Sequence, residues 1–407
     1  MHVSFLNILL GVSWLLLFRY CQIHSYADPG AFFFDAERAF TPFYSAARET
    51  EADYFLQKLP TTTAAADQPR RDSSSSDRIC LGIPSIRRQG EQFLPRTVAS
   101  LVDTLSLEQR RQLVIVVLLA DDEPQINPAF GQAWLERLTD EVLVYADPSS
   151  LPVATNYRSI NGSQQHDGAS REKHVQLDYA SLVDACITHD ADYFALLEDD
   201  VIASRDWLAR LRSSLSQIEN MATPKDWLYL RLFYAEKYLG WNSEEWPSYS
   251  KNVALVYAAA AATVVLFRRV KLALLQPAKW EVRLHGSRRT FPAVQFNFWM
   301  LAFIGLYFMA GRLTVNGYQA GLREMERNGC CAQGLVFPSR HLRMLASRLK
   351  EPPHDLPGDS FIEQVADNEG LSRWAMVPSV LQHVGVRGSS ESGGVRKTSW
   401  NFSFERL

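Results

Sequence analysis

The chain has few cysteines, and they show no familiar metal-binding spacing. Five cysteines are spread over 407 residues, too few and too odd a number for the disulfide framework of a small secreted domain. Neither a Cys-x-x-Cys nor a His-Glu-x-x-His pattern occurs, which argues against a zinc centre. Cys80 and Cys186 lie on expected core elements and Cys330–Cys331 are adjacent, which leaves room for one or two bridges.

An excess of charge of one sign is also lacking. The formal net charge is -3, so there is no electrostatic reason to expect a nucleic acid as partner. A hydrophobic content of 47% with 21% charged residues is ordinary for a globular protein and sufficient for a core. The length allows two domains, or one large domain with insertions.

Three long apolar runs are present and divide the chain. The first, Val3 to Phe18, is followed by Arg19. It is either a signal peptide cleaved at the small residues Ser25–Ala27 or an uncleaved signal anchor. The second run is Val253 to Phe267, and the third is Phe291 to Ala310. The second is short for a bilayer, which needs about 20 apolar residues.

The connector between the second and third runs is strongly basic. Lysine or arginine occupies seven positions between residues 268 and 290, against Glu281 alone. The positive-inside rule places such a loop in the cytosol, so we predict a transmembrane hairpin. A pair of buried core helices is the alternative. With the hairpin, the acidic cluster discussed below and the two sequons at Asn161 and Asn401 all lie on the luminal side.

Strands and helices are predicted to alternate outside the apolar runs. Residues 28–60 read as a stem helix that packs on the membrane or on the following domain, and residues 61–77 have linker composition. Strands are expected at 78–83, 113–119, 141–145, 193–197, 227–233 and 374–378, with helices at 97–105, 134–138, 175–186 and 360–369. Repeated βα units of this kind predict an α/β fold with a mostly parallel sheet flanked by helices.

These strands occur on both sides of the hairpin, so the hairpin is predicted to be an insertion in one domain. We expect a transmembrane signal anchor at 1–24, a stem and linker at 25–77, the first part of the α/β domain at 78–250, the hairpin with its cytosolic loop at 251–312, and the second part of the domain at 313–407.

Three consecutive acids, Glu198, Asp199 and Asp200, end the apolar strand at 193–197. The carboxyl ends of strands are where open α/β sheets bind ligands. Adjacent carboxylates repel one another unless they face water or a cation, and hard oxygen ligands suit Mg²⁺ or Mn²⁺, the usual partners of a diphosphate. The sequence therefore predicts a nucleotide-sugar site, with Asp200 the first choice for metal contact and Glu198 and Asp199 placing ribose or metal-bound water. An acidic first turn of a helix is the alternative.

Other candidates surround this centre. His383, in a Gln-His-Val-Gly stretch, is a candidate metal ligand as a neutral imidazole. Inversion at a sugar carbon requires a carboxylate base, and Asp359 and Glu363, four apart on one face of an expected helix, are the candidates, with Asp355 and Asp367 as further possibilities. The nucleotide should lie over the end of the first strand, near Pro84, Ser85 and Arg87. Asp121 or Asp122, after the second strand, should lie near the base or ribose, and the basic side chains of Arg171 and Lys173 could face the diphosphate.

The motifs, in order, resemble those of the fold-A (GT-A) glycosyltransferases that include N-acetylglucosaminyltransferase IV. They are Leu81–Arg88, Lys173 with Asp178–Tyr179, Leu197–Val201 and Val377–Gly385, and the resemblance adds Asp178 to the donor site. The hairpin inserted before the last motif resembles, more specifically, the family of the fourth post-GPI-attachment factor. Those are Golgi N-acetylgalactosamine transferases that act on the GPI glycan.

This resemblance implies an inverting, metal-dependent hexosaminyltransferase. It implies UDP-N-acetylgalactosamine as donor, Mn²⁺ (or Mg²⁺) as metal, and a mannose of the GPI core on GPI-anchored proteins as acceptor. The protein would be a multi-pass Golgi membrane protein with a luminal catalytic domain. Two alternatives are an N-glycan-branching N-acetylglucosaminyltransferase and a non-catalytic membrane protein that keeps the domain for binding.

Overall fold

The computed structural model consists of two compact units. A helical unit comprises residues 1–41 and 237–318, and a sheet unit comprises residues 42–236 and 319–407. The residues that the structure describes are 5–59, 78–146, 148, 151, 156–160, 170–221, 226–243, 245–274, 290–325, 332–385 and 399–407.

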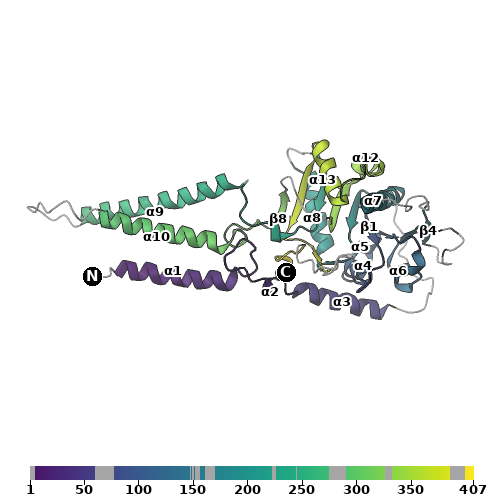
Figure 1. Cartoon of the computed structure of the whole chain (residues 1–407), viewed down its shortest axis with the longest axis horizontal. Helices are drawn as coiled ribbons and strands as arrows, with labels where there is room; N and C mark the ends of the chain where they lie inside the picture. The colour runs from purple at the N-terminus through teal and green to yellow at the C-terminus, as the bar shows by residue number, and fades with distance from the viewer. Residues whose placement is uncertain are drawn as a thin grey trace, which may run out of the picture. The chain divides into compact units, whose positions relative to one another are not determined.

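The sheet unit is built on a sheet of nine described strands in the order β4-β3-β2-β1-β5-β9-β7-β10-β8 (Figure 1). The strands are β1 (Ile79–Ser85), β2 (Leu113–Leu119), β3 (Glu141–Val144), β4 (Tyr157–Ser159), β5 (Tyr193–Leu197), β7 (Trp227–Arg231), β8 (Gly321–Glu324), β9 (Gly334–Pro338) and β10 (Ser372–Val377). Neighbours from β4 to β5 are parallel, as are β7 and β10. By contrast, β9 runs antiparallel to β5 and β7, and β8 to β10. The predicted mostly parallel α/β class is confirmed.

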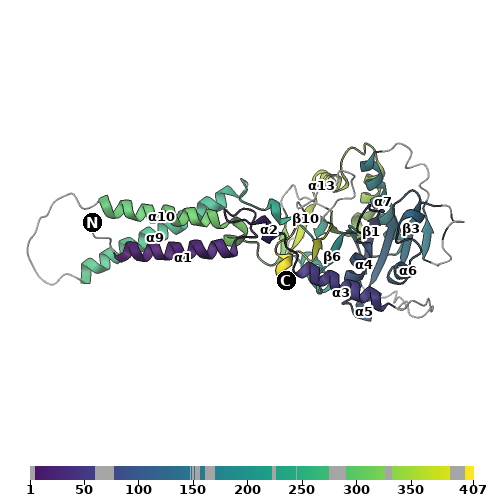
Figure 2. The same ribbon diagram turned by 60° about the horizontal axis from the view of Figure 1, so that its bottom comes forward.

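Helices cover both faces of this sheet (Figures 1 and 2). One face carries α4 (Leu94–Val102), α6 (Ala133–Leu138) and α8 (Trp207–Glu219), and the other carries α7 (Arg171–Thr188), α12 (Ser339–Lys350) and α13 (Gly358–Asn368). Alternate residues of β2 pack on opposite faces, so all of Leu113–Leu119 is buried. A continuous apolar run is what a strand covered on both sides requires.

Shorter elements complete the unit. Helices α3 (Tyr44–Lys58) and α5 (Leu107–Arg111) and the 3₁₀ turns Pro124–Ile126 and Phe404–Arg406 lie around the sheet, and the 3₁₀ turn Glu236–Tyr238 begins at the last residue of the unit's first part. A separate antiparallel pair joins β6 (Val201–Ala203) to β11 (Leu381–His383). This pair is small, but it positions the site described below.

The first strand is longer than predicted. Its predicted end was Ile83, whereas β1 continues through Pro84 and Ser85. Beyond Gly82, β1 pairs with β2 but no longer with β5. The missing N–H of Pro84 is tolerated there because that stretch has a neighbour on one side only.

Strand β9 was not predicted, although it lies in the middle of the sheet. It inserts between β5 and β7, antiparallel to both. Strands β5 and β7 precede the apolar helices α9 (Trp246–Leu274) and α10 (Thr290–Ala310) in sequence, and β9 and β10 follow them. One sheet is therefore assembled from the parts of the chain before and after these two helices.

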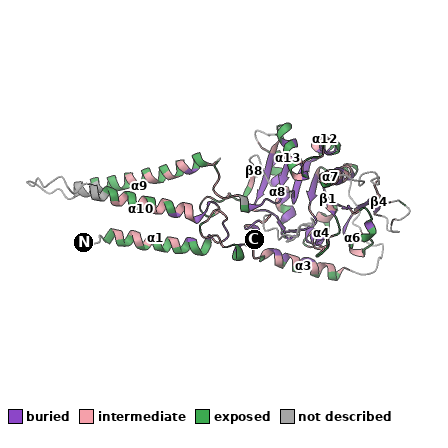
Figure 3. Cartoon of the chain, in the orientation of Figure 1, coloured by how far each residue is buried: buried purple, intermediate pink, exposed green. Residues whose placement is uncertain are grey.

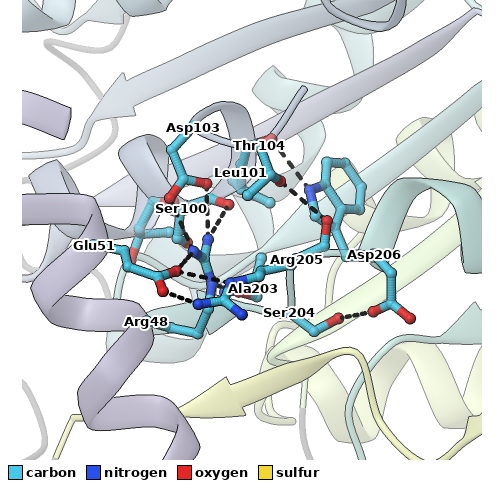
Figure 4. Close-up of polar contacts among 12 residues, drawn as sticks. Arg48, Glu51, Ser100, Leu101, Asp103, Thr104, Ala203, Ser204, Arg205 and Asp206 are labelled. Atoms are coloured by element: carbon cyan, nitrogen blue, oxygen red, sulfur yellow. Dashed lines mark hydrogen bonds and ion pairs between the residues drawn. The ribbon is translucent and has the colours of Figure 1, made fainter. Parts of the chain in front are cut away.

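A buried arginine fixes helix α3 on the sheet unit (Figure 4). The guanidinium of Arg48 is fully buried and donates to Asp103 Oδ1 at 2.7 Å, to Ala203 O at 2.9 Å and to Glu51. Removing one partner of a buried ion pair costs about 3–5 kcal/mol, because the other charge is left uncompensated. Of the two alternatives for the stem, α3 packs on the sheet domain.

A disulfide joins Cys80 of β1 to Cys186 of α7, with a Cα–Cα distance of 5.7 Å. It closes a loop across 106 residues of sequence, and a loop of that length restricts the unfolded chain strongly. The structure thus contains one of the bridges for which the sequence left room. Among the described residues Cys21 is free and buried, and Cys330–Cys331 lie outside them.

The helical unit contains three helices that are long and apolar enough to cross a membrane: α1 (Phe5–His24), α9 (Trp246–Leu274) and α10 (Thr290–Ala310). The short α2 (Ala36–Ala39) and α11 (Arg312–Val315) also belong to it. Almost none of the apolar residues on the three long helices are buried, whereas the strands of the other unit are (Figure 3). Exposed apolar surface of this extent is typical of a membrane-contacting protein.

The second apolar helix is not short, which corrects the sequence analysis. Helix α9 has 29 residues, and its apolar stretch runs from Trp246 to Phe267. Polar residues precede Val253, so the hydrophobic run in the sequence begins later than the helix does. These polar residues are nevertheless compatible with a helix. Pro247 stands in the first turn, where no backbone N–H is needed. Most of the basic connector lies outside the described residues.

Helix α1 packs against α10 through specific polar contacts. The indole of Trp14 donates to Ala302 O at 3.0 Å, and the indole of Trp299 donates to Asn7 Oδ1 at 3.1 Å. Beyond the ends of these helices, Asp28 accepts hydrogen bonds from the backbone of Gly30 and Thr314. The first apolar segment is thus an integral part of the helical unit in this structure.

Candidate functional site

A cavity of about 910 Å³ opens at the carboxyl ends of β1, β2 and β5. Helix α7, the start of α13 and the end of β11 contribute the other walls. This is the edge of the sheet at which ligands bind in open α/β folds. Residues that the sequence placed at the site and that line the cavity are Pro84, Ser85, Asp121, Asp122, Arg171, Asp178, Glu198, Asp199, Asp200, Asp359 and His383.

The acidic cluster forms the turn between β5 and β6. Asp199 and Asp200 are buried and Glu198 is half-buried. Ser85 Oγ, at the end of β1, donates to Asp199 Oδ2 at 2.6 Å. Two neighbouring strands therefore hold the cluster at the cavity floor.

The β6–β11 pair brings His383 to Asp200. His383 is opposite Val201 in the register, and Val384 N donates to Asp200 O at 2.9 Å. His383 Nε2 lies 3.3 Å from Asp200 Oδ2. A Cβ at Gly385 would overlap the Asp200 carboxylate, so only glycine allows this close approach.

Glu198, Asp200 and His383 form a set suited to a divalent ion. Each offers one ligand atom, and these atoms lie within 4.8 Å of one another. Asp200 Oδ1 is buried and accepts no hydrogen bond from the described part of the chain, which is costly unless another group binds it. Carboxylate oxygens with one imidazole suit Mn²⁺ or Mg²⁺, so the residues fit the metal that the sequence predicted. Asp199 is outside this set of three.

The structure adds Arg88, which the sequence analysis missed. Arg88 Nη2 lies 3.0 Å from Asp200 Oδ2 and also contacts Asp199 Oδ1, with the side chain only 12% exposed. Its neighbour Arg87 was predicted at the site instead, but Arg87 is exposed, does not line the cavity, and donates its backbone N–H to Asp121. Two adjacent arginines predict a cation near the acids, but the sequence does not indicate which of the two faces them.

Charges in the cluster shift one another's pKa values. Burial and the neighbouring Asp200 carboxylate raise the pKa of Glu198 to about 7. Burial alone would raise the pKa of Asp200, but His383 and Arg88 lower it below its ordinary value. Burial would lower the pKa of His383, yet Asp200 and Glu198 raise it. Asp200 is thus the member of the cluster that stays ionised most readily.

The two candidate bases lie on the same helix but in different surroundings. Asp359, in the first turn of α13, lines the cavity. Glu363 does not line it, because it binds Arg231 and lies 2.9 Å from Arg373 Nε in a buried ion network. The spacing of four residues correctly places Asp359 and Glu363 on one face of α13. It does not indicate that Asp359 faces the cavity while Glu363 faces the buried ion network.

Some predicted residues lie away from the cavity, and others were missed. Lys173, Asp355 and Asp367 do not line it. The lining residues that were not assigned to the site from the sequence are Ile86, Arg88, Ala120, Glu123, Ile126, His174, Val175, Tyr179, Ala332, Gln333 and Ser399. Several come from α7 and from segments far away in sequence, for which no local pattern exists.

Asp178 of α7 is buried at the cavity wall. Tyr145 Oη donates to Asp178 Oδ1 at 2.7 Å. Burial, with a contribution from the Asp122 charge, raises the pKa of Asp178 to about 7, despite the hydrogen bond from Tyr145. An acid with a raised pKa destabilises the fold once it ionises.

Asp178→Asn is therefore expected to stabilise the protein at alkaline pH. The native state holds the proton up to about pH 7 and the unfolded chain only to about pH 3.8, so wild-type stability falls as pH rises through that window. A shift of about three units at about 1.36 kcal/mol each sets an upper limit of about 4 kcal/mol. Thermal unfolding in detergent should show that the variant's gain in stability over wild type is much larger at pH 8 than at pH 4.5. Equal differences at both pH values would contradict the assignment.

The apparent sequon at Asn401 has a structural role. Asn401 is fully buried, and its side-chain amide donates to Tyr234 O at 3.0 Å and Ser379 Oγ at 2.8 Å. Gln382, next to His383, donates to Asn401 O at 2.9 Å. The C-terminal segment thereby supports β11 and the histidine of the site. The sequon at Asn161 lies outside the described residues.

Comparison with known proteins identifies the family. Residues 79–382 match the family model described as GPI-N-acetylgalactosamine transferase PGAP4. The chain belongs to this family. The match extends over both parts of the sheet unit and over helices α9 and α10 between them.

More distant similarity extends to curated N-acetylglucosaminyltransferases. The chain is 27% identical over 158 residues to alpha-1,3-mannosyl-glycoprotein 4-beta-N-acetylglucosaminyltransferase A of Xenopus tropicalis, covering 37% of this chain and 28% of that enzyme. Enzyme C of Mus musculus is 24% identical over 147 residues (35% and 30%), and enzyme C of Danio rerio is 26% identical over 214 residues (48% and 44%). The similarity thus covers less than half of each of these relatives.

Proposed function

We propose that this protein is a hexosaminyltransferase that transfers N-acetylgalactosamine from UDP-GalNAc to a mannose of the GPI core. The observation that carries the proposal is the set Glu198, Asp200 and His383 at the floor of the cavity, in a chain whose family is described as GPI-N-acetylgalactosamine transferases. Anomeric inversion and dependence on Mn²⁺ or Mg²⁺ are parts of the same proposal.

The donor would lie across the ends of β1, β2 and β5. Asp121 and Asp122, just after β2, would accept hydrogen bonds from the ribose hydroxyl groups or from N–H groups of the base. Arg171 would supply positive charge. Glu198, Asp200 and His383 would hold the divalent ion, which, when bound, neutralises the diphosphate leaving group as a Lewis acid.

Asp359 is the residue that we propose as general base. It lines the cavity from the start of α13 and is half-buried. A carboxylate there would accept the proton of an acceptor hydroxyl as the new glycosidic bond forms. Glu363, bound to Arg231 and Arg373, would hold the helix that carries Asp359.

We further propose that the catalytic domain is luminal and that the protein is a multi-pass Golgi membrane protein. Two observations support this: three helices long and apolar enough to cross a membrane, and the disulfide Cys80–Cys186, a bond typical of oxidising compartments. Under this proposal 1–24 is a retained anchor, 25–77 a stem and linker, 251–312 a hairpin, and 78–250 with 313–407 the catalytic domain. A site tethered to the bilayer raises the effective concentration of membrane-anchored acceptors.

A second candidate donor and acceptor is suggested by the relatives. The three enzymes reported above are named as 4-beta-N-acetylglucosaminyltransferases acting on alpha-1,3-mannosyl-glycoproteins. Transfer of N-acetylglucosamine to a mannose of an N-glycan would use the same metal–diphosphate centre. The two candidates differ in the sugar pocket and the acceptor, and not in the residues that hold the ion.

The test uses the purified full-length protein in detergent with Mn²⁺. Equal concentrations of UDP-GalNAc and UDP-GlcNAc are offered with a GPI-anchored protein or with a mannose-terminated N-glycoprotein, and the product is identified by mass spectrometry. Transfer of N-acetylgalactosamine to GPI alone supports the proposal. Transfer of N-acetylglucosamine to the N-glycan supports the second candidate. Nucleotide binding without transfer in any combination would instead indicate a non-catalytic binding protein.

A further inference from the structure

Within the acidic centre, a guanidinium occupies the position of a counter-cation. We propose that Arg88 competes with the divalent ion for Asp200, leaves Asp200 when the ion binds, and then contacts the diphosphate. The inference rests on the proposed function, because it requires the metal and diphosphate site. It goes further by assigning a role to Arg88, which was not among the site residues predicted from the sequence.

The geometry shows two groups converging on one oxygen. Arg88 Nη2 lies 3.0 Å from Asp200 Oδ2, and His383 Nε2 lies 3.3 Å from the same atom. The other oxygen, Asp200 Oδ1, is buried and accepts no hydrogen bond from any described residue. Arg88 therefore contacts only one oxygen of a carboxylate that also belongs to the candidate metal set.

Charge explains why Arg88 is there. Asp199 and Asp200 are both buried, and adjacent buried carboxylates repel strongly unless a cation accompanies them. Arg88 contacts both of them. A divalent ion bound by Asp200 would also compensate these charges, and two cations at one carboxylate repel each other. We therefore expect the bound ion to displace Arg88 from Asp200.

Position explains where Arg88 would go. Arg88 follows β1 in a stretch without regular structure between Ser85 and Leu94, and its guanidinium lines the cavity. Once separated from Asp200, the side chain remains inside the space that the diphosphate would fill. Guanidinium groups bind phosphate oxygens in a bidentate manner. Ion and nucleotide would then favour each other, because the ion frees the cation that the diphosphate uses.

The experiment measures metal affinity and not activity alone. Isothermal titration calorimetry with Mn²⁺, without nucleotide, compares the full-length wild type with Arg88→Gln, Arg88→Lys and the control Arg348→Gln. Arg348 is a half-exposed arginine on α12, so its replacement makes the same change in net charge away from the site. We expect Arg88→Gln to bind Mn²⁺ about tenfold tighter, equivalent to about 1.4 kcal/mol. Arg88→Lys should stay closer to wild type, and Arg348→Gln should equal it.

A second titration, with UDP at saturating Mn²⁺, should give the opposite order. Arg88→Gln is expected to bind UDP about tenfold more weakly, since a charge-assisted contact is lost. If Arg88 only supported the metal ligands, Arg88→Gln would bind Mn²⁺ more weakly or unchanged, and that result would overturn the proposal.

Two further outcomes are decisive. If Arg88→Gln unfolds without metal, the proposal requires that Mn²⁺ raise its melting temperature more than that of wild type, because the ion would replace the missing cation; no such rescue would refute it. If the wild type itself binds neither Mn²⁺ nor UDP, the metal site of the proposed function fails, and the role of Arg88 fails with it. If the wild type binds Mn²⁺ and UDP but the affinities of the Arg88 variants do not follow the expected order, only the inference about Arg88 is wrong.

Discussion

Asp200→Asn is expected to lower sugar transfer by about 10²–10³-fold, the loss seen when one group that stabilises developing charge is removed. The substitution keeps the shape of the side chain and removes the negative charge that lies beside His383 and Arg88. A divalent ion would lose one of its three candidate ligands, Glu198, Asp200 and His383. The leaving diphosphate would then lack its neutralising charge.

The measurement pairs initial transfer rates with the thermal stability of the same preparations. Some loss of stability is expected as well, because Asp200→Asn leaves Arg88 and His383 without one of their acidic partners, so rates are compared at a temperature at which both proteins are folded. Asp184→Asn is the matched control: Asp184 is an exposed aspartate on the same helix as Asp178, paired with Lys350. An Asp200→Asn variant that keeps the wild-type rate at saturating Mn²⁺ would refute the metal site.

Asp359→Asn is expected to lower kcat for transfer by about 10²–10⁴-fold, the usual contribution of a general base. The affinity for UDP with Mn²⁺ should change little, because Asp359 belongs to α13 and not to the acidic turn after β5. Calorimetry for UDP and a transfer assay on the same preparation separate the two effects.

Glu363→Gln provides the contrast, on the same helix and four residues away. Glu363 is bound by Arg231 and by Arg373 in a largely buried network, so its replacement leaves two guanidinium groups undercompensated and should lower thermal stability. The UDP affinity should be retained. If Glu363→Gln abolished transfer at unchanged stability while Asp359→Asn stayed active, the assignment of the base to Asp359 would be wrong.

Several features followed from local sequence alone. The run Leu113–Leu119 was predicted as a strand buried on both faces, and it is β2. The acids after Tyr193–Leu197 were predicted at a strand end facing a ligand, and they line the cavity. These succeed because strand burial and strand termination are encoded within a few consecutive residues.

Other features depend on pairing between distant segments. His383 reaches Asp200 because β11 aligns with β6, bringing together residues more than 180 positions apart. Strand β9 lies between β5 and β7, and nothing in its own residues specifies these neighbours. Register and strand order are set by the fit of the whole core, which a window of sequence does not contain.

The sequence by itself determined the composition of this protein's parts: an α/β domain with acids at a strand end, three apolar helices, and a chain interrupted by two of them. Periodicity, charge and run length are local properties, and they act on residues that are neighbours in the chain. Only the tertiary structure decided that Arg88 and not Arg87 faces the acids, and that Asp359 and not Glu363 opens on the cavity. Adjacent or equally spaced residues have the same local signal, and only packing against distant segments gives each side chain its own environment.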